Sequence, residues 1–486
     1  MIDLHADVAV LGAGFGGSLT AMLAKQVGLK PVLIERDVHP RFTIGESSTP
    51  QGDIVLAALA ERYDLPRISP LAAYGSWKRA YPNVTCGLKR GFSYFHHTDG
   101  SPFQPMANRE SELIVAASVD DEHSDTHWYR EEFDALFVAE AESMGIPYLD
   151  RTTLHRLEPG DPWTLTGHRE SDRIRITADF VVDATGPSSP LLNALGIRQD
   201  GHALLTNSRT IYSHFKSVAR WQDTYCDAGG GTEEHPFSCD DAALHHVFDG
   251  GWMWVLRFEN GVTSAGFVLD NSRHPLNENL PPDEEWQALL NRFPSIARQF
   301  TQAIPVMPLR RTGRMQRRAS CMAGDNWAML PYAAAFVDPL HSSGNAHTLA
   351  GIERLIPILA ADPSARPPML TTYEETTLRE VALLDRIIHG CYQCFDRFPL
   401  FAAFAMFYFA GADFSERRRR AGEHRVGDAF LNADDPAYCR AVSAAYEELL
   451  TGPDMEPFAG LVASSIDPWN NVGLCERSKR NMYDYA

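Results

Sequence analysis

The chain has 486 residues, of which 44% are hydrophobic and 22% are charged, and its formal net charge is -19. This length is enough for two or three structural modules, and the composition is typical of a globular protein. The large negative charge argues against nucleic acid and against an anionic membrane as partners, because both are themselves negatively charged.

The first strand is expected almost at the start of the chain, in the apolar run that precedes the glycines of VAVLGAGFGG. A strand in this place leaves no room for a signal peptide. The eight cysteines do not indicate a disulfide framework, and the pair Cys391 and Cys394 has zinc or redox spacing without a second pair. We therefore expect a cytoplasmic protein with reduced thiols and no metal site.

The glycine-rich turn after this strand has the GxGxxG spacing of a dinucleotide site, with one extra glycine. Its members are Gly12, Gly14, Gly16 and Gly17. Glycines allow a tight turn and a close approach of the backbone to a pyrophosphate, and the following helix directs its N-terminus at that negative charge. A second strand, KPVLIE, ends in Glu35, an acid that suits the ribose hydroxyls of an adenosine. Together these features predict a bound dinucleotide.

Two later segments also have a strand followed by small residues, DFVVDATG at 179–186 and NWAMLPYAAAFVDPLHSSG at 326–344. They lie far apart in the sequence, so the simplest arrangement is one discontinuous Rossmann-like α/β domain within residues 1–365. The stretches of about 60–120 and about 200–310 alternate apolar and polar residues and are rich in aromatic side chains. This alternation predicts an interleaved antiparallel sheet that binds the substrate.

From residue 366 onward the apolar residues recur at three- and four-residue spacing. This pattern predicts a mostly helical C-terminal region, 366–486, that caps the substrate pocket. Its longest apolar run, FPLFAAFAMFYFAGA at 398–412, is too short to cross a bilayer, so we expect a buried helix there. The fold class expected from these signals is α/β, with an added antiparallel sheet and C-terminal helices.

The segment MAGDNWAML places Gly324 and Asp325 beside a predicted strand. An aspartate in such a position either contacts the ribityl chain of a flavin or caps the N-terminus of a helix. The chain has a single dinucleotide fingerprint, and the DATG strand and this C-terminal segment accompany it. These features favour FAD over NAD as the bound dinucleotide.

With these residues in view, the chain resembles the flavin-dependent halogenases, a family within the aromatic-hydroxylase type of FAD monooxygenases. The resemblance covers most of residues 5–360, and the pair of tryptophans points to the halogenase branch. In chain order its motifs are GAGFGG, RFTIGESSTP, LKRGFSYF, WYREEFDALF, DATG, GGWMWVLRF and GDNWAMLPYAAAFVDPLHSSGNAHTL.

The resemblance implies an FAD-dependent oxidoreductase of natural-product biosynthesis. In this family reduced FAD, dioxygen and chloride or bromide produce hypohalous acid, and a lysine then delivers the halogen to an aromatic or otherwise electron-rich small molecule. The reduced flavin comes from a separate NAD(P)H-flavin reductase. The substrate is either free or tethered to a carrier protein.

Carried over residue by residue, the resemblance assigns further FAD contacts to three of the motifs. These residues are Arg41, Glu46, Arg130, Pro339, Gly344 and Asn345. The HSSG loop matches the family's loop whose backbone N–H groups hold the halide, here those of Ser343 and Gly344. The same N–H groups also suit the O2 carbonyl of a flavin, so the loop indicates flavin more strongly than halide.

The family's lysine corresponds to Lys89, which precedes the aromatic strand RGFSYF. Desolvation beside a substrate pocket disfavours the charge of an amine and so aids its reaction with an electrophile. The alternative is a solvated strand lysine next to Arg90. His341 either exchanges a proton with a phenol or carbonyl substrate or is held by structural hydrogen bonds. The glutamate that serves the substrate in tryptophan-specific members does not precede Ser342, so free tryptophan is not the expected substrate.

The family motif Trp-x-Trp-x-Ile-Pro, thought to wall the flavin from the substrate, corresponds to Trp252 and Trp254, but Arg257 replaces the proline. In one interpretation Arg257 extends to solvent or pairs with an acid such as Glu259 on the same strand face, and the enzyme still halogenates. In another, Arg257 anchors a carboxylate or thioester-linked substrate near the flavin, and the enzyme is a monooxygenase or dehydrogenase. A flavoprotein that binds a ligand without turnover is a third alternative, which the intact motifs disfavour.

Overall fold

The computed structural model describes residues 2–485, and strands from residues 2–183 and 323–329 build a mainly parallel sheet. In spatial order its strands are β18 (Ala323–Gly324), β19 (Trp327–Met329), β10 (Asp172–Asp183), β1 (Ile2–Leu11), β2 (Pro31–Ile34) and β7 (Tyr148–Leu149). An antiparallel hairpin of β8 (Thr152–Glu158) and β9 (Trp163–Arg169) continues from β10. The last four residues of β1 are all buried, as expected for a parallel strand covered on both faces.

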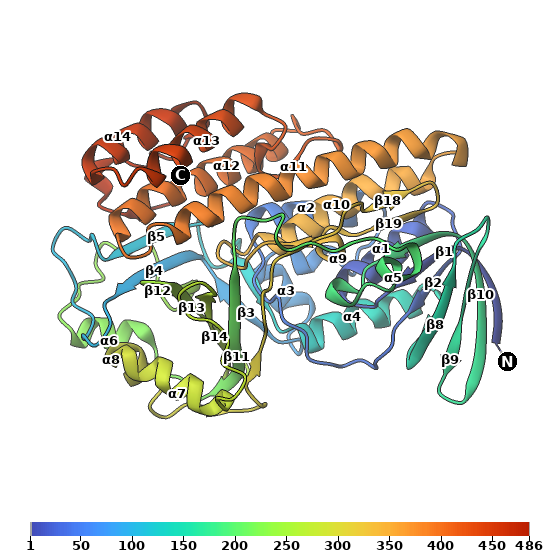
Figure 1. Cartoon of the computed structure of the whole chain (residues 1–486), viewed down its shortest axis with the longest axis horizontal. Coiled ribbons are helices and arrows are strands. Elements are labelled where there is room, and N and C mark those ends of the chain that lie inside the picture. Colours follow the sequence, from blue (N-terminus) through green and yellow to red (C-terminus); the bar gives the residue numbers. More distant parts are fainter. Residues whose placement is uncertain (1, 486) are drawn as a thin grey trace.

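A second, mainly antiparallel sheet lies beside the first (Figure 1). Its strands, in spatial order, are β15 (Ile304–Pro305), β11 (Ser208–Lys216), β14 (Val262–Asp270), β13 (Gly251–Arg257), β12 (Ala243–Phe248), β4 (Gly91–His97), β5 (Glu112–Ala116) and β21 (Met482–Tyr483), with β16 (Arg310–Arg311) also on β11. Two pairings, β12 with β4 and β21 with β5, are parallel. The last strand brings the end of the chain into this sheet, a feature that the sequence did not indicate.

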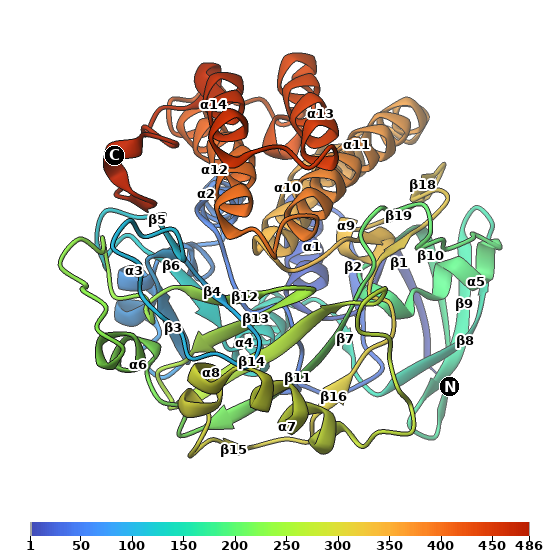
Figure 2. The ribbon, with the colours of Figure 1, turned by 60° about the vertical axis from the view of Figure 1, so that its left-hand side comes forward.

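Two short antiparallel pairs complete the strands, β3 (Cys86–Lys89) with β6 (Asp125–Trp128) and β17 (Arg317–Arg318) with β20 (Ala335–Phe336). The helices are α1 (Phe15–Gln26), α2 (Pro50–Arg62), α3 (Tyr74–Ala80), α4 (Arg130–Ser143), α5 (Pro190–Leu195), α6 (Trp221–Asp227), α7 (Pro282–Arg292), α8 (Pro294–Gln299), α9 (Pro331–Ala334), α10 (Ser343–Ala360), α11 (Arg366–Tyr392), α12 (Phe398–Arg420), α13 (Pro436–Leu450) and α14 (Met455–Ile466). Helices α1, α4 and α10 pack together, and α7 and α8 lie on the outer side of the second sheet (Figure 2).

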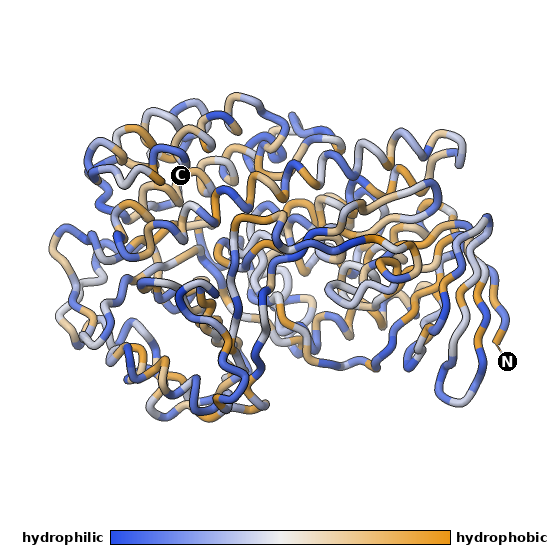
Figure 3. The backbone as a smooth tube through the Cα atoms, viewed as in Figure 1, coloured by the Kyte–Doolittle hydropathy of each residue, from blue (hydrophilic) through white to orange (hydrophobic). Residues whose placement is uncertain are grey.

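The C-terminal helices α11 to α14 form a layer along one side of the molecule, above both sheets (Figures 1 and 2). Hydrophobic and hydrophilic stretches alternate along these helices, so each has one face for the interior (Figure 3). Helix α12 is the exception, because it packs against α2, α11 and α14 and is apolar over most of its surface. Its length and composition would suit a membrane span, but 78% of its most apolar window is buried inside the protein, which makes it a core helix.

The fold class expected from the sequence is therefore confirmed: a Rossmann-like α/β part, a mainly antiparallel sheet and C-terminal helices. Strands β1, β2, β10 and β19 run in the same direction, so their C-terminal ends meet at one edge of the parallel sheet. Loops at this edge are where such folds bind nucleotides. The second sheet closes the space beyond this edge, and the candidate site lies there.

Candidate active site

A cavity of about 1050 Å³ lies at the C-terminal ends of the parallel strands. One end is lined by the glycine turn, by Glu35 after β2 and by residues 184–188 after β10. The other end reaches the second sheet at Trp252 and Trp254. A space of this size and extent suits a ligand as large as a dinucleotide, with its phosphates at the glycine turn.

The glycines of the turn have different roles. Gly12 has φ +91°, and a Cβ on Gly17 would lie 1.9 Å from the carbonyl oxygen of Gly12, so both residues are needed for the turn and its packing. Gly12, Gly14 and Gly16 line the cavity, whereas Gly17 does not. A Cβ on Gly14 would come no closer than 3.6 Å to Arg130 or Asp134, so that position is open.

Glu35 holds the adenosine end of the cavity in shape. Its Oε2 accepts a hydrogen bond from the backbone N–H of Ala13 (3.0 Å) and an ion pair from Arg41 (3.0 Å). Burial raises the pKa of Glu35, but Arg41 and two backbone N–H groups outweigh burial and leave the pKa below its usual value. Glu35 is therefore ionised, as recognition of ribose hydroxyls requires.

Arginines give the cavity a positive lining in an otherwise acidic protein. Arg130 pairs with Asp134 (2.8 Å) and donates to the carbonyl of Gly45 (2.9 Å), which fixes the loop that also carries Glu46. Four further arginines that line the cavity were missed in the sequence. They are Arg36, next to Glu35, and three residues of the basic run RRTGRMQRR: Arg310, Arg314 and Arg317.

These residues fit FAD. The glycine turn and the arginines are suited to bind a pyrophosphate. The Nε of Arg317 is buried without a hydrogen-bond partner within residues 2–485, so it is free to donate to a ligand. Of the residues assigned to FAD, those found in the cavity wall are Gly12, Gly14, Gly16, Glu35, Arg41, Glu46, Arg130, Pro339, Gly344 and Asn345. Gly17 does not line the cavity and instead packs against the backbone of Gly12.

The contact considered between Asp325 and the ribityl chain of a flavin is wrong. Asp325 is exposed in the turn between β18 and β19, at the N-terminal end of β19. The cavity lies at the opposite end of that strand, where Leu330 and Tyr332 line it. The sequence pattern did not show which end of β19 faces the cofactor. Because Asp325 lies at the end away from the cavity, it cannot contact a ribityl chain.

Trp252 and Trp254 share one face of β13 and form the wall of the cavity on the side of the second sheet. Their ring centroids are 6.2 Å apart. Trp252 Nε1 donates to the hydroxyl of Tyr392 (3.2 Å), and Trp254 Nε1 donates to Ser264 (3.1 Å). The donors are thus satisfied within the protein, and the rings are held in place as expected for a wall.

Arg257 lies on the other face of the same strand, because side chains alternate along a strand. Its Nε pairs with Asp240 (3.0 Å), and its other nitrogens donate to the carbonyls of Val218 (3.1 Å) and Ala219. The structure agrees with the first sequence interpretation that Arg257 pairs with an acid, but the acid is Asp240, and Glu259 pairs with Lys78. The second interpretation is wrong, because Arg257 does not line the cavity and anchors no substrate there.

The HSSG loop leads into α10 at the cavity. Ser342, with φ +54°, precedes the helix, and Gly344 and Asn345 in its first turn line the cavity. A Cβ on Gly344 would meet no atom within 4 Å, so the space in front of its backbone is open. The Ser343 side chain is buried and does not line the cavity, which leaves its backbone N–H as the group relevant to an anion.

His341 is fully buried in the wall between the cavity and the C-terminal helices. Its Nδ1 lies 3.2 Å from the hydroxyl of Tyr94, its Nε2 lies 3.7 Å from Cys391 Sγ, and its ring stacks on Tyr408. Burial lowers the pKa of His341 to about 3, so the ring is neutral. A proton exchange with substrate is therefore not supported by its position, and the structural alternative holds.

A second, smaller pocket of about 50 Å³ lies between α2, the second sheet, α12 and the C-terminal tail. Lys89 lies just behind it, with an exposed fraction of 0% and its Nζ 4.1 Å from the ring centroid of Phe92, which lines the pocket. The lysine is therefore not solvated. Lys89 lies directly across from Asp125 in the β3–β6 pair, so both side chains lie on the same side.

Two buried acids accompany Lys89, and sequence reasoning missed both. Its Nζ lies 3.6 Å from Asp125, and Asp53 is held by a hydrogen bond from Ser48 (3.1 Å). Burial lowers the pKa of Lys89, raises that of Asp125 to about 6, and raises that of Asp53, where repulsion from Asp125 adds to the effect. The two acids oppose the effect of burial on Lys89, but burial outweighs them, so the pKa of Lys89 is below its usual value and its neutral amine is more accessible than in water.

The loop before α2 connects the two spaces. Ser47 lines the large cavity, Thr49 lines the small pocket, and the carbonyl of Ser48 between them accepts a hydrogen bond from Lys89 Nζ. Asn345 at the start of α10 donates to the carbonyl of Ser47 (3.2 Å). Lys89 is thus placed at the boundary between the cofactor cavity and a separate pocket.

Comparison with known proteins agrees with this arrangement. The family model for tryptophan halogenase matches residues 125–398. The monodechloroaminopyrrolnitrin halogenase PrnC of Pseudomonas fluorescens is 29% identical over 461 residues, covering 91% of this chain and 79% of its own. The tetracycline 7-halogenase of Kitasatospora aureofaciens is 30% identical over 410 residues, covering 82% of this chain and 72% of its own.

Solved structures show the same fold. The crystal structure of halogenase PltM in complex with phloroglucinol and FAD superposes with a TM-score of 0.87 at 23% identity, covering 98% of this chain and 99% of that one. The flavin-dependent brominase Bmp2 gives a TM-score of 0.66 at 17% identity, covering 92% of this chain and 100% of that one. Sequence and fold agree with the site geometry, and the chain belongs to the tryptophan halogenase family of FAD-dependent halogenases.

Proposed function

We propose that the protein oxidises chloride or bromide in the large cavity and transfers the halogen to an electron-rich aromatic ring in the small pocket. The observation that carries this proposal is the position of Lys89, buried between the two spaces and bonded to the carbonyl of Ser48. The tryptophan wall lies on the cofactor side. The substrate ring is thereby kept away from the flavin while the halogen reaches it through the lysine.

FAD, when bound, supplies the redox chemistry with dioxygen that converts halide into hypohalous acid. We assign the halide to the backbone N–H groups of Ser343 and Gly344, because the first turn of a helix leaves N–H groups free and α10 places positive potential there. The Asn345 contact to Ser47 brings this end of the cavity close to the loop that holds Lys89.

The chemistry proposed for Lys89 requires its neutral amine. The nitrogen attacks the halogen of hypohalous acid and displaces hydroxide. The hydroxide takes a proton from the amine and leaves as water. The resulting N–halogen group then gives its halogen to a ring carbon, and the proton displaced from that carbon returns to the nitrogen. Burial favours the neutral amine, which supports this sequence of steps.

The relatives support an aromatic substrate, since their names concern a tetracycline and an aminopyrrolnitrin, and the PltM crystal holds phloroglucinol. One relative is named as a chlorinase of a carrier-bound pyrrole, so a carrier-tethered ring is a second form of substrate to include in the assay. The single dinucleotide fingerprint supports reduction of FAD by a separate reductase. The free cysteines support a reducing compartment, and we place the protein in the cytoplasm.

Halide oxidation is tested without knowledge of the substrate. The purified protein is supplied with FAD, a flavin reductase, NADH, oxygen, catalase and either bromide, chloride or no halide, together with a small-molecule trap for hypohalous acid. We expect trap halogenation that depends on both enzyme and halide. An untouched trap, with the same rate of flavin oxidation with and without halide, would remove the basis of the proposal.

A further inference from the structure

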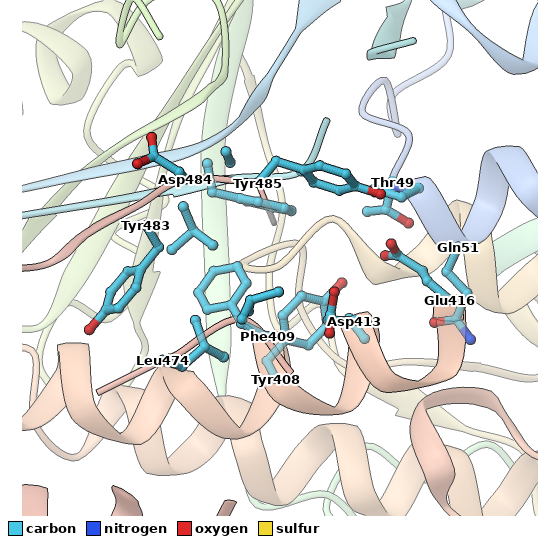
Figure 4. Close-up of a pocket in the computed structure, with 17 residues that line it drawn as sticks. Thr49, Gln51, Tyr408, Phe409, Asp413, Glu416, Leu474, Tyr483, Asp484 and Tyr485 are labelled. Atoms are coloured by element: carbon cyan, nitrogen blue, oxygen red, sulfur yellow. The ribbon is translucent and has the colours of Figure 1, made fainter. Parts of the chain in front are cut away.

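The small pocket has a polar end and an aromatic end (Figure 4). Thr49 and Gln51 at the start of α2 face Glu416 from α12 at the polar end, which is the end nearest Lys89. Phe409 and Tyr483 lie toward the other end. An occupant of this pocket therefore meets apolar rings on one side and hydrogen-bonding groups on the other.

Glu416 is unusual among the buried acids of this protein. It is 6% exposed, its carboxylate points into the pocket, and it accepts no hydrogen bond from any residue that the structure describes. Burial raises the pKa of Glu416, and repulsion from Asp125 adds to this, while the guanidinium of Arg420 acts in the opposite direction. The carboxyl group of Glu416 faces the pocket and is therefore available to a ligand that carries a donor.

A second polar group in the same pocket points to the same conclusion. Thr49 lines the pocket, and its hydroxyl is buried without a partner within residues 2–485. In contrast, Asp413, one turn before Glu416, is already bound by Arg417 (2.9 Å) and Asn471 (3.4 Å). Glu416 and Thr49 are therefore both available to a ligand in this pocket.

The chemistry of these groups limits what fits. A carboxyl group keeps an oxygen that accepts hydrogen bonds whether or not it is ionised, and Lys89 directs its proton to the carbonyl of Ser48. A ring that carries an O–H or an N–H supplies the donor for that oxygen. The same substituents donate electrons into an aromatic ring, which is the property that electrophilic halogenation needs.

We propose that Glu416 binds and orients the substrate by accepting a hydrogen bond from an O–H or N–H group attached directly to the aromatic ring. The inference rests on the proposed function for the reaction, and it adds the residue that selects the substrate and the class it selects: phenols and aromatic amines. The ring then lies among Phe92, Phe409 and Tyr483, with its donor-bearing edge toward Glu416 and Lys89.

The test measures binding to the FAD-loaded protein by calorimetry, using matched probes. Phloroglucinol is compared with 1,3,5-trimethoxybenzene, which has no O–H, and aniline is compared with N,N-dimethylaniline, which has no N–H. The first pair tests a phenol and the second an aromatic amine. We expect the wild-type protein to bind the donor-bearing member of at least one pair about 10- to 100-fold more tightly.

Glu416→Leu is expected to fold, because it replaces an unpaired buried carboxyl by an apolar group, and to lose this preference entirely. Glu416→Gln keeps an acceptor without charge and is expected to retain part of it. Asp413→Asn is the matched control, and we expect less than a threefold change because that carboxylate is already occupied. Equal preference in wild type and Glu416→Leu, or no preference for either donor in the wild type, would overturn the assignment.

The trap assay on the same preparations separates this inference from the proposed function. Glu416→Leu is expected to leave halide-dependent trap halogenation unchanged, because Glu416 is outside the cofactor cavity. If the trap stays unmodified in every variant while the binding preference is lost in Glu416→Leu, the proposed function fails and the substrate site stands. If Glu416→Leu weakens FAD binding, the residue supports the fold and the assignment is wrong.

Discussion

Arg257→Ala is expected to destabilise the protein and leave its chemistry intact. The guanidinium pairs with Asp240, whose side chain is 0% exposed, while the Arg257 side chain is 23% exposed. Asp240 also accepts hydrogen bonds from the backbone N–H groups of Trp221 (2.9 Å) and Gln222 (2.8 Å) at the start of α6. Removal of the arginine leaves this buried carboxylate with two neutral donors and with Arg220, 3.9 Å away and 45% exposed, as the remaining nearby cation.

The expected loss in the free energy of unfolding follows from these contacts. Breaking a fully buried ion pair costs about 3–5 kcal/mol. The partial exposure of Arg257 and the two remaining donors of Asp240 reduce the cost here to about 2 kcal/mol. Arg220→Ala is the matched control, because Arg220 is 45% exposed and 3.9 Å from Asp240, and we expect it to cost below about 1 kcal/mol.

Stability is measured by urea unfolding with tryptophan fluorescence, and activity by halide-dependent trap halogenation per folded molecule. Arg257→Ala is expected to lower the urea midpoint clearly more than Arg220→Ala and to keep activity within about twofold, since the wall tryptophans are on the opposite face of β13. A variant with an unchanged midpoint and a tenfold loss of activity would show that Arg257 acts at the cavity, and that its side chain is not on the face of β13 opposite Trp252 and Trp254.

Three further predictions concern the cofactor cavity and its supports. Gly14→Ala is expected to fold, because its Cβ comes no closer than 3.6 Å to Arg130 and Asp134, and to weaken FAD binding about tenfold, because a side chain hinders the close approach of a pyrophosphate to the turn; titration with FAD measures this. Gly17→Ala, whose Cβ would lie 1.9 Å from the carbonyl oxygen of Gly12, is expected to reduce the yield of folded protein itself; equal behaviour of the two variants would contradict the division of roles. Burial raises the pKa of Asp338 to about 6, so near pH 5 the folded state holds a proton that the unfolded state has lost. The free energy of unfolding therefore falls by about 1 kcal/mol between pH 5 and pH 8, as the folded state loses this proton. Asp338→Asn removes that dependence, so the difference in urea midpoint between wild type and variant should change with pH; a constant difference would refute the assigned pKa.

The cofactor half of the site was predictable because its signals are local. A strand, a glycine turn and a helix adjoin in the sequence, and Glu35 follows the next strand directly. The face of Arg257 was also available, since an odd spacing from Trp252 and Trp254 places it on the other side of a strand. Asp325 failed because a pattern of small residues does not show at which end of a strand the ligand binds.

The pocket around Lys89 was not predictable in the same way. Asp53, Asp125 and Glu416 come from α2, β6 and α12, and no motif joins these segments. Their meeting depends on how α12 packs against α2 and on the pairing of β3 with β6. The strand formed by the end of the chain, which brings Tyr483 to the pocket, also arises from packing and not from a local signal.

The most direct test of a lysine between two separate spaces compares wild type with Lys89→Met in one reaction. Both receive FAD, a reductase, NADH, oxygen, bromide or chloride and phloroglucinol, and mass spectrometry reports the product. The account predicts a halogenated product from the wild type and at least a 100-fold smaller yield from Lys89→Met, with FAD affinity and trap halogenation retained. A variant that still halogenates the ring at the wild-type rate, or a wild type that adds oxygen in place of halogen, would contradict it.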